Sequence, residues 1–195
     1  MFEGIDAWKA AGYPVVPEAP PPGDLILNPS VEDGDVWPYY WSRGKAADVS
    51  GEHVWSSIAA NGSRSLVVRI QSNLGAAQSH AVFWYQKWNL DDPDCPFTRG
   101  STYIYRAWYQ TDNATMRIYV GMWDISYKWI QSANNYTDVR SATPSTWEQS
   151  NWITFTVPAD AKYIAVGMAI RLAGIDDGVS QALGRADDFE VLEIG

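Results

Sequence analysis

From Asp24 onward, the sequence consists of short segments in which apolar and polar residues alternate, separated by clusters of Gly, Pro, Asn, Asp and Ser. A period of two places successive side chains on opposite faces of a β-strand. No convincing long segment has the 3.6-residue period of an amphipathic helix. Many short strands at close spacing predict an all-β fold, a sandwich or a barrel. We expect strands near 45–49, 52–57, 65–71, 79–88, 102–110, 115–123, 127–131, 151–157, 162–172 and 186–194.

Two of these segments show the alternation clearly. In 115–123 and 162–172, one row is apolar, and we assign it to the core: Ile118, Val120, Met122, Ile164, Val166, Met168 and Ile170. The opposite row of each segment is aromatic, basic or small: Arg117, Tyr119, Gly121, Trp123, Tyr163, Ala165, Gly167, Ala169 and Arg171. The alternation therefore predicts a second face, with Ala165, Gly167 and Ala169 as its floor.

Two further segments add candidates to this face. In 102–110, Arg106 and Trp108 oppose the row of Tyr103 and Tyr105, and we place Arg106 and Trp108 with the second face. In 79–88, the row of Val82, Trp84, Gln86 and Trp88 opposes the row of Ala81, Phe83, Tyr85 and Lys87. The pattern does not decide which of these two rows is buried; Trp84 and Gln86 are kept as candidates.

Aromatic composition suggests what this face binds. The chain has 11 Trp and 11 Tyr beside 5 Phe. Trp and Tyr are favoured where one part of a ring packs and a polar edge meets water or a ligand. Sugar rings stack on such side chains, and their hydroxyls accept hydrogen bonds from Arg and Gln. A carbohydrate site is therefore one interpretation, and a solvated face whose arginines pair with acidic neighbours is the other.

Charge and composition exclude other classes. The net charge of −9 argues against nucleic acid or an anionic membrane as partner. One cysteine, Cys95, allows no intrachain disulfide. The N-terminus lacks the basic and apolar regions of a signal peptide, so we expect an intracellular protein or a piece of a larger secreted one. Residues 1–23 are proline-rich and read as a linker or an N-terminal arm, with one domain over 24–195.

Several motifs resemble those of carbohydrate-binding modules of families 4, 9 and 22, which have a galactose-binding-domain-like β-jelly roll. The opening "Asn-Pro-Gly-Phe-Glu-x-Gly" of these families is similar to residues 28–34, and a Trp-rich stretch follows at 37–41. Later matches, in the family order, are Gly62–Val68, Gly100–Trp108, Trp152–Pro158 and Ala186–Val191. The resemblance implies two sheets, with a ligand cleft on the concave face of one. It also makes Tyr40 and Trp41 candidates for a cleft wall.

The same resemblance implies a structural calcium ion where the first and last strands meet. Calcium takes six to eight oxygen ligands from carboxylates and carbonyls. The matching positions are the Ser30 carbonyl, Glu32, a carbonyl near Ser63, and Asp187. Paired surface acids are the alternative role of Glu32 and Asp187.

We therefore expect a non-catalytic, extracellular binding module, monomeric within a multidomain enzyme, that holds a β-linked polysaccharide such as β-glucan, cellulose or xylan for an attached glycoside hydrolase. Its arginines leave an acidic polysaccharide open. A structural or adhesive jelly roll is the first alternative. A polysaccharide lyase is the second, with His80, Tyr119 and Arg117 as imagined catalytic residues. The predicted face carries no clear pair of acids, as a hydrolase would need.

Overall fold

A computed structural model describes residues 25–71, 79, 81–133, 135–144 and 146–194. The predicted linker or arm at 1–23 and the lyase candidate His80 lie outside the described residues. The elements are β1 (Ser42–Lys45), β2 (Gly51–Ser56), β3 (Ser65–Gln71), β4 (Ala81–Asn89), β5 (Thr102–Asp112), β6 (Ala114–Trp123), a 3-10 turn η1 (Gln131–Ala133), β7 (Asn135–Val139), β8 (Glu148–Gln149), β9 (Ile153–Thr156), β10 (Tyr163–Ile175) and β11 (Gln181–Glu193).

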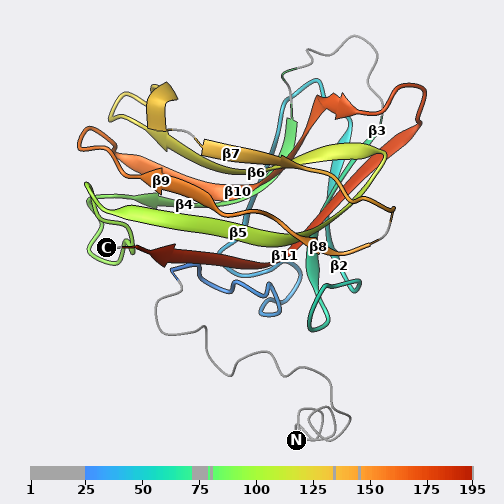
Figure 1. Ribbon diagram of the computed structural model, residues 1–195, viewed down its shortest axis with the longest axis horizontal. Coiled ribbons are helices and arrows are strands. Elements are labelled where there is room, and N and C mark those ends of the chain that lie inside the picture. The colour runs from blue at the N-terminus through green and yellow to red at the C-terminus, as the bar shows by residue number, and fades with distance from the viewer. Residues whose placement is uncertain (1–24, 72–78, 80, 134, 145, 195) are drawn as a thin grey trace, which may run out of the picture.

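The strands form two antiparallel sheets, which confirms the predicted β-sandwich. One sheet has the order β1-β4-β10-β6-β7, and the other has the order β2-β3-β11-β5-β8, with β9 also paired to β5. Figure 1 shows β6 and β10 in one layer and β5 and β11 in the other. Each sheet places strands from both halves of the chain side by side, because β4 pairs with β10 and β3 with β11.

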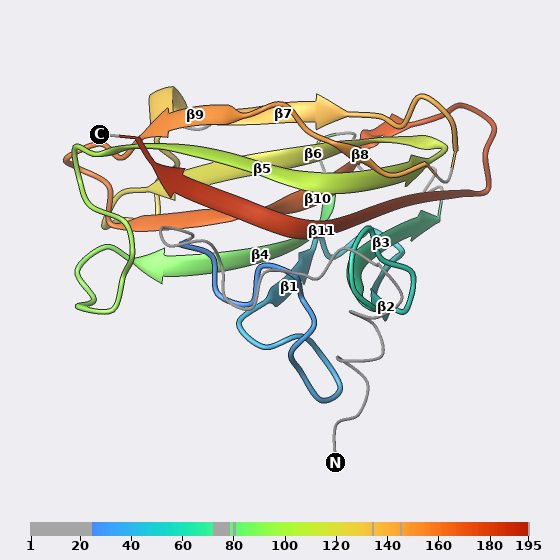
Figure 2. The same cartoon turned by 60° about the horizontal axis from the view of Figure 1, so that its bottom comes forward.

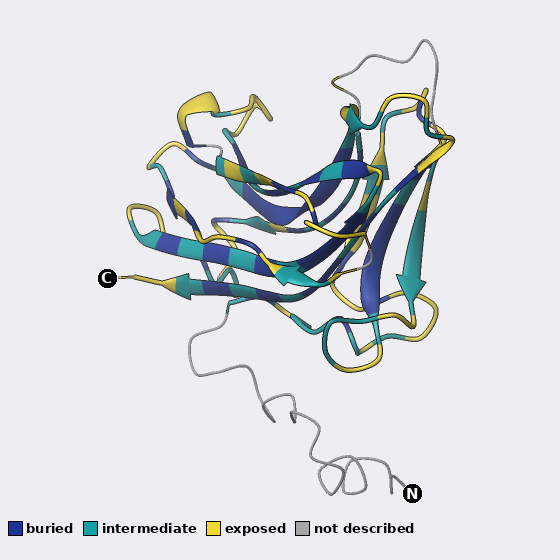
Figure 3. Cartoon of the chain, turned by 45° about the vertical axis from the view of Figure 1, so that its right-hand side comes forward, coloured by how far each residue is buried: buried dark blue, intermediate teal, exposed yellow. Residues whose placement is uncertain are grey.

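The core lies between the two sheets and follows the alternation. Buried and less buried residues alternate along the strands in Figure 3. The predicted inner rows of 115–123 and 162–172 are buried, as are Tyr103 and Tyr105 from β5. Tyr105 donates a hydrogen bond across the core to the Gly167 carbonyl (3.2 Å). The core therefore joins the two sheets through a polar contact as well as through apolar packing.

Contacts between the sheets tie both edges of the sandwich. At one edge, β7 and β9 lie side by side (Figure 2), and the Asn135 side chain donates to the Thr154 carbonyl (2.8 Å). At the other edge, Nε2 of His53 on β2 lies 3.1 Å from the carbonyl oxygens of both Gly44 and Phe83. Burial is the main cause that lowers the pKa of His53. The contacts of His53 tie β2 to the edge strand β1 and to its neighbour β4 in the other sheet.

Three predicted strand ranges were wrong. The range 45–49 overlaps β1 (Ser42–Lys45) only at Lys45. Residues 127–131 belong to the turn after β6, with one isolated bridge between Trp123 and Trp129, and the edge strand β7 follows at 135–139. The last strand begins at Gln181 instead of 186, because its first half pairs with β3. No helix in the described part of the chain has the length and apolar character needed to cross a membrane.

We expect Trp84→Ala to lower the free energy of unfolding by about 3–5 kcal/mol, measured by urea denaturation. Trp84 is fully buried, and its Nε1 donates to the Val67 carbonyl (2.9 Å). The control is Trp152→Ala on the surface, where Arg106 lies over the ring (4.0 Å) and the loss should be about 1 kcal/mol or less. Equal losses for the two variants would contradict the placement of Trp84 in the core.

Candidate functional site

The outward face of the five-stranded sheet carries a groove of about 420 Å³. Its floor is the predicted small row of the central strand β10, where Ala165 and Ala169 line the groove and Gly167 lies between them. These residues register with Lys87, Tyr85 and Phe83 of β4 on one side. On the other side they register with Gly121, Tyr119 and Arg117 of β6. The groove exists because a row without large side chains runs between two rows that have them.

One end of the groove is aromatic. Trp123 and Trp129 meet edge to face with ring centroids 4.9 Å apart, and Tyr127 stacks on Tyr163 at 4.5 Å. The exposed Lys87 places its Nζ 4.6 Å from the Tyr163 ring centroid, 4.8 Å from that of Tyr127 and 5.6 Å from that of Trp123. Such cation–π contacts hold the ammonium group among the rings while it remains exposed to solvent.

The other end of the groove is basic. Arg117 forms a two-pronged ion pair with Asp138 of β7 (2.8 and 2.9 Å) and lies over the Tyr136 ring (3.5 Å). The hydrogen bond to Asp138 is the main cause that raises the pKa of Arg117. Arg171 lies at the end of the small row and lines the groove. The alternative interpretation from sequence, arginine paired with an acid, therefore describes Arg117.

A partly buried tyrosine lies in the middle of the groove. Tyr119 is next to Gly167 in register, and burial raises its pKa well above the ordinary value for a phenol, with a smaller effect from Tyr85. Its hydroxyl therefore stays protonated at neutral pH and can donate a hydrogen bond. Among the described residues that line the groove there is no Asp, Glu or His.

Of the predicted ligand residues, the structure brings five together at this groove: Arg117, Tyr119, Trp123, Tyr163 and Arg171. Sequence analysis missed Phe83, Tyr85 and Lys87, because both rows of β4 contain aromatic residues. It also missed Tyr127 and Trp129, which come from the turn that was taken for a strand. The isolated bridge between Trp123 and Trp129 folds this turn back toward the end of β6.

Three predicted ligand residues lie in the core instead. Trp84 and Gln86 belong to the inner row of β4, so placing them on the ligand face was wrong. The Gln86 side chain exchanges hydrogen bonds with the backbone of Leu27 and so holds the opening segment. Trp41 is buried against Phe189 (4.4 Å between centroids), and its Nε1 donates to the Asn28 carbonyl (3.1 Å). Because packing and hydrogen bonds in the core engage these three side chains, they do not contribute to the groove.

Two other predicted residues, Arg106 and Trp108, lie on the wrong sheet for the predicted face. They belong to the outer row of β5, in the six-stranded sheet. There Arg106 pairs with Glu190 (2.7 Å) and with Gln149 (3.1 Å). Alternation identifies the face of a strand, but it does not identify the sheet. Tyr40 is 65% exposed, adopts φ 69°, and is not among the residues that line the groove.

Comparison with known proteins finds similar folds among solved structures. No protein-family model matches the sequence, and no curated protein sequence matches it. Among solved structures, a family 61 carbohydrate-binding module in complex with β-1,4-galactotriose is 14% identical with a TM-score of 0.53, over 88% of this chain and 99% of that one. The C-terminal family 22 module of a Clostridium thermocellum protein is 20% identical with a TM-score of 0.55, over 89% of this chain and 98% of that one.

The likeness is one of fold. A Stig cyclase from Fischerella sp. TAU is also similar, at 10% identity and a TM-score of 0.58 over 88% of this chain and 97% of that one. The chain spans only 21% of a similar bacteriophage CBA120 tailspike domain. Proteins with similar folds therefore include both binding modules and enzymes. The function of this chain has to be argued from the residues of its groove.

Three of the four predicted calcium residues, Glu32, Ser63 and Asp187, meet at one loop. Glu32 accepts hydrogen bonds from the Ser63 backbone and hydroxyl and from the Arg64 backbone (2.6–2.8 Å). Asp187 accepts hydrogen bonds from the backbone N–H groups of Ala60 and Asn61 (2.9 and 3.2 Å). Loop 60–64 therefore joins the opening segment to the last strand. Ser30 lies between Pro29 and Val31, whose carbonyls accept from Phe189 N and Trp55 Nε1.

Asp187 is unusual among the described acids of the chain because it is fully buried. A register shift in β11, with Asp188 at φ 43°, turns Asp187 into a fully buried position. Burial, and secondarily the charge of Asp188, raise the pKa of Asp187 to about 8. A cation beside it would offset this cost, and carboxylate and carbonyl oxygens are the ligands that a hard ion takes. Within the described residues, no group of three or more acidic, His or Cys side chains is placed to hold a metal.

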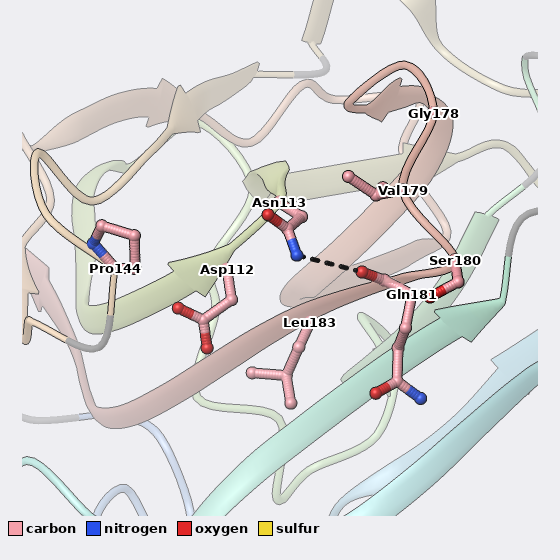
Figure 4. A pocket seen from close by; sticks show the side chains of 8 residues that line it. All are labelled: Asp112, Asn113, Pro144, Gly178, Val179, Ser180, Gln181 and Leu183. Carbon is pink, nitrogen blue, oxygen red and sulfur yellow. Dashed lines mark hydrogen bonds between the residues drawn. The ribbon is translucent and has the colours of Figure 1, made fainter.

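A second cavity, of about 610 Å³, opens at one end of the sandwich, between the β5–β6 turn and the loop before β11 (Figure 4). The Asn113 side chain donates to the Gln181 carbonyl across it (3.3 Å). The described residues that line it carry no aromatic ring: Asp112, Asn113, Pro144, Gly178, Val179, Ser180, Gln181 and Leu183. These residues offer no stacking surface of the kind that the groove has.

We expect Gly121→Ala to disturb the aromatic end of the groove. An added Cβ would lie 2.9 Å from Trp123 and 3.0 Å from Trp129, so both rings would have to move, at a cost of about 1–3 kcal/mol. The near-ultraviolet circular dichroism and the melting temperature should both change. A spectrum identical to that of the unmodified protein would show that the two rings do not lie over Gly121.

Proposed function

We propose that the protein is a non-catalytic carbohydrate-binding module that holds a β-linked polysaccharide in the groove. The observation that carries the proposal is the aromatic end over a floor of Ala and Gly, since flat sugar faces stack on Trp and Tyr. The likeness in fold to modules of families 22 and 61 supports it. Binding should be weak to moderate, roughly −4 to −8 kcal/mol, which is millimolar to micromolar.

The lining of the groove favours binding over catalysis. Glycoside hydrolysis uses two carboxylic acids across the scissile bond, and the described lining contains none. A lyase would need a base, and the raised pKa of Tyr119 makes its phenol a poor one at neutral pH. We therefore propose that the module serves an attached glycoside hydrolase outside the cell, as a monomer, by raising the effective substrate concentration. β-Glucan, cellulose and xylan are the neutral candidates.

We also propose a structural calcium ion between the opening segment and the last strand. The Ser30 carbonyl, a carbonyl near Ser63, Glu32 and Asp187 would hold it. The bound ion would supply the positive charge that the buried Asp187 carboxylate needs. Its role would be to stabilise loop 60–64 against the sandwich, away from the groove.

Trp123→Ala should weaken polysaccharide binding by about thirtyfold, since losing the ring contact costs about 2 kcal/mol. Affinity electrophoresis against β-glucan, xylan, mannan, polygalacturonate and alginate measures the change. Trp108→Ala is the matched control, because this Trp lies on the other sheet and its removal should leave affinity unchanged.

Two results would count against binding in the groove. If Trp108→Ala weakened binding as much as Trp123→Ala, the site would lie elsewhere. If no polymer retarded the unmodified protein, a structural jelly roll would take precedence, and light scattering would then test for oligomers. Release of reducing ends or of unsaturated products would make the protein an enzyme.

Removing calcium with a chelator should lower the melting temperature by roughly 5–10 °C, the shift expected when a ligand at a hundredfold its Kd is lost. Glu32→Gln should abolish this response, because the amide oxygen can still accept from the backbone N–H groups of Ser63 and Arg64 while the charge is lost. Asp35→Asn is the control, since Asp35 bonds the Tyr39 hydroxyl (2.8 Å) instead of the loop. Equal melting curves with and without chelator, with no metal found by elemental analysis, would refute the proposal.

A further inference from the structure

The charged side chains that line the groove all have the same sign. They are Lys87, Arg117 and Arg171. The chain as a whole has a net charge of −9. The groove is therefore a basic site on an acidic protein. Like charges around one concave surface create a positive potential there, which attracts an anionic ligand.

The three cations differ in how far the protein itself satisfies them. Asp138 neutralises Arg117 through two hydrogen bonds. Lys87 is held by aromatic rings, which leave its charge uncompensated and its ammonium exposed. Arg171 has no hydrogen-bond or ion-pair partner among the residues that the structure describes. The net positive charge of the groove thus resides on Lys87 and Arg171.

These two cations stand at opposite ends of the groove. Lys87 registers with Ala165, six residues before Arg171 on β10. At a rise of about 3.3 Å per residue, their backbone positions are about 20 Å apart. Gly167 and Ala169 of the floor and Tyr119 of β6 lie between them, and Trp123 lies just beyond Lys87. The spacing suits an extended chain that carries more than one negative charge.

The hydrogen-bonding inventory points the same way. The ammonium, the two guanidinium groups and the indole N–H groups of Trp123 and Trp129 only donate. Apart from hydroxyl groups, the described lining side chains offer no hydrogen-bond acceptor. A sugar hydroxyl both donates and accepts, whereas a carboxylate or sulfate only accepts. A donor-rich groove therefore complements an anionic sugar better than a neutral one.

From these observations we infer that the groove binds an anionic polysaccharide, whose carboxylate or sulfate groups pair with Arg171 and Lys87 while its rings stack on the aromatic end. This inference rests on the proposed function and names the ligand class of the same groove. Arg171 is a specificity-determining residue here, because its planar fork can bind either anion with two hydrogen bonds.

The test compares polymers that separate charge from sugar rings. Carboxymethylcellulose supplies carboxylates, cellulose sulfate supplies sulfates, and hydroxyethylcellulose is neutral; all three have the same β-glucan backbone. Titration calorimetry at two salt concentrations should show tighter binding of at least one anionic polymer, weakened by added salt. Arg171→Gln should weaken that binding about tenfold, and Arg171→Lys should recover part of it.

Lys45→Gln provides the matched control, since it removes the same charge from the same sheet. Lys45 is exposed on β1 and registers with the inner-row residue Val82, so it does not face the groove. Removing this charge should leave the affinity unchanged. If Lys45→Gln weakened binding as much as Arg171→Gln, the effect would come from the net charge of the protein, and the inference would be overturned.

The remaining outcomes distinguish the two proposals. If hydroxyethylcellulose bound as tightly as the anionic polymers and Arg171→Gln changed nothing, the inference would fail while carbohydrate binding stood. If no polymer bound at all, the proposed function would fail, and the inference with it. Binding of only one anionic polymer would support the inference and decide between carboxylate and sulfate.

Discussion

Strand β10 imposes the constraint on which the rest of the structure depends. Its inner row of Ile164, Val166, Met168 and Ile170 is fully buried between the sheets. Its outer row has almost no side-chain volume at Ala165, Gly167 and Ala169. Because strand side chains alternate strictly, one strand both fills the core and hollows the surface. A larger residue at Ala165 or Ala169 would fill the groove, whereas at Gly167 even a Cβ would lie 2.1 Å from the Trp84 carbonyl oxygen of the neighbouring strand.

The side chains that give the groove its chemical character come mainly from the strands next to β10. β4 and β6 contribute the walls, and the turn after β6 brings Tyr127 and Trp129 to the aromatic end. The backbone holds these strands in register by hydrogen bonds that do not depend on the outer side chains. Such a sheet can change its ligand without changing its fold. This independence explains why binding modules and a cyclase can share the architecture.

Away from the groove, hydrogen bonds from loop 60–64 to two acids connect the opening segment to the last strand. Glu32 and Asp187 both receive hydrogen bonds from loop 60–64, although the two acids come from opposite ends of the described chain. Asp187 is buried there at an electrostatic cost, which its raised pKa of about 8 records. Gly62 approaches the Glu32 carboxylate so closely that an added Cβ would lie 2.4 Å from its oxygen. The loop, the acids and the glycine thus form one unit, separate from the groove.

The sequence by itself determined the fold class and the two faces of β6 and β10, since their rows differ sharply in polarity and size. It also located the acids that meet loop 60–64, although whether they hold calcium stays a prediction. It did not separate the rows of β4, where Phe83, Tyr85 and Trp84 are all aromatic. Nor did it reveal that Arg106 and Trp108 face away from the groove. Alternation relates each side chain only to its own strand, whereas the assignment of strands to sheets depends on hydrogen bonds between residues far apart in the chain, and only the tertiary structure decides those.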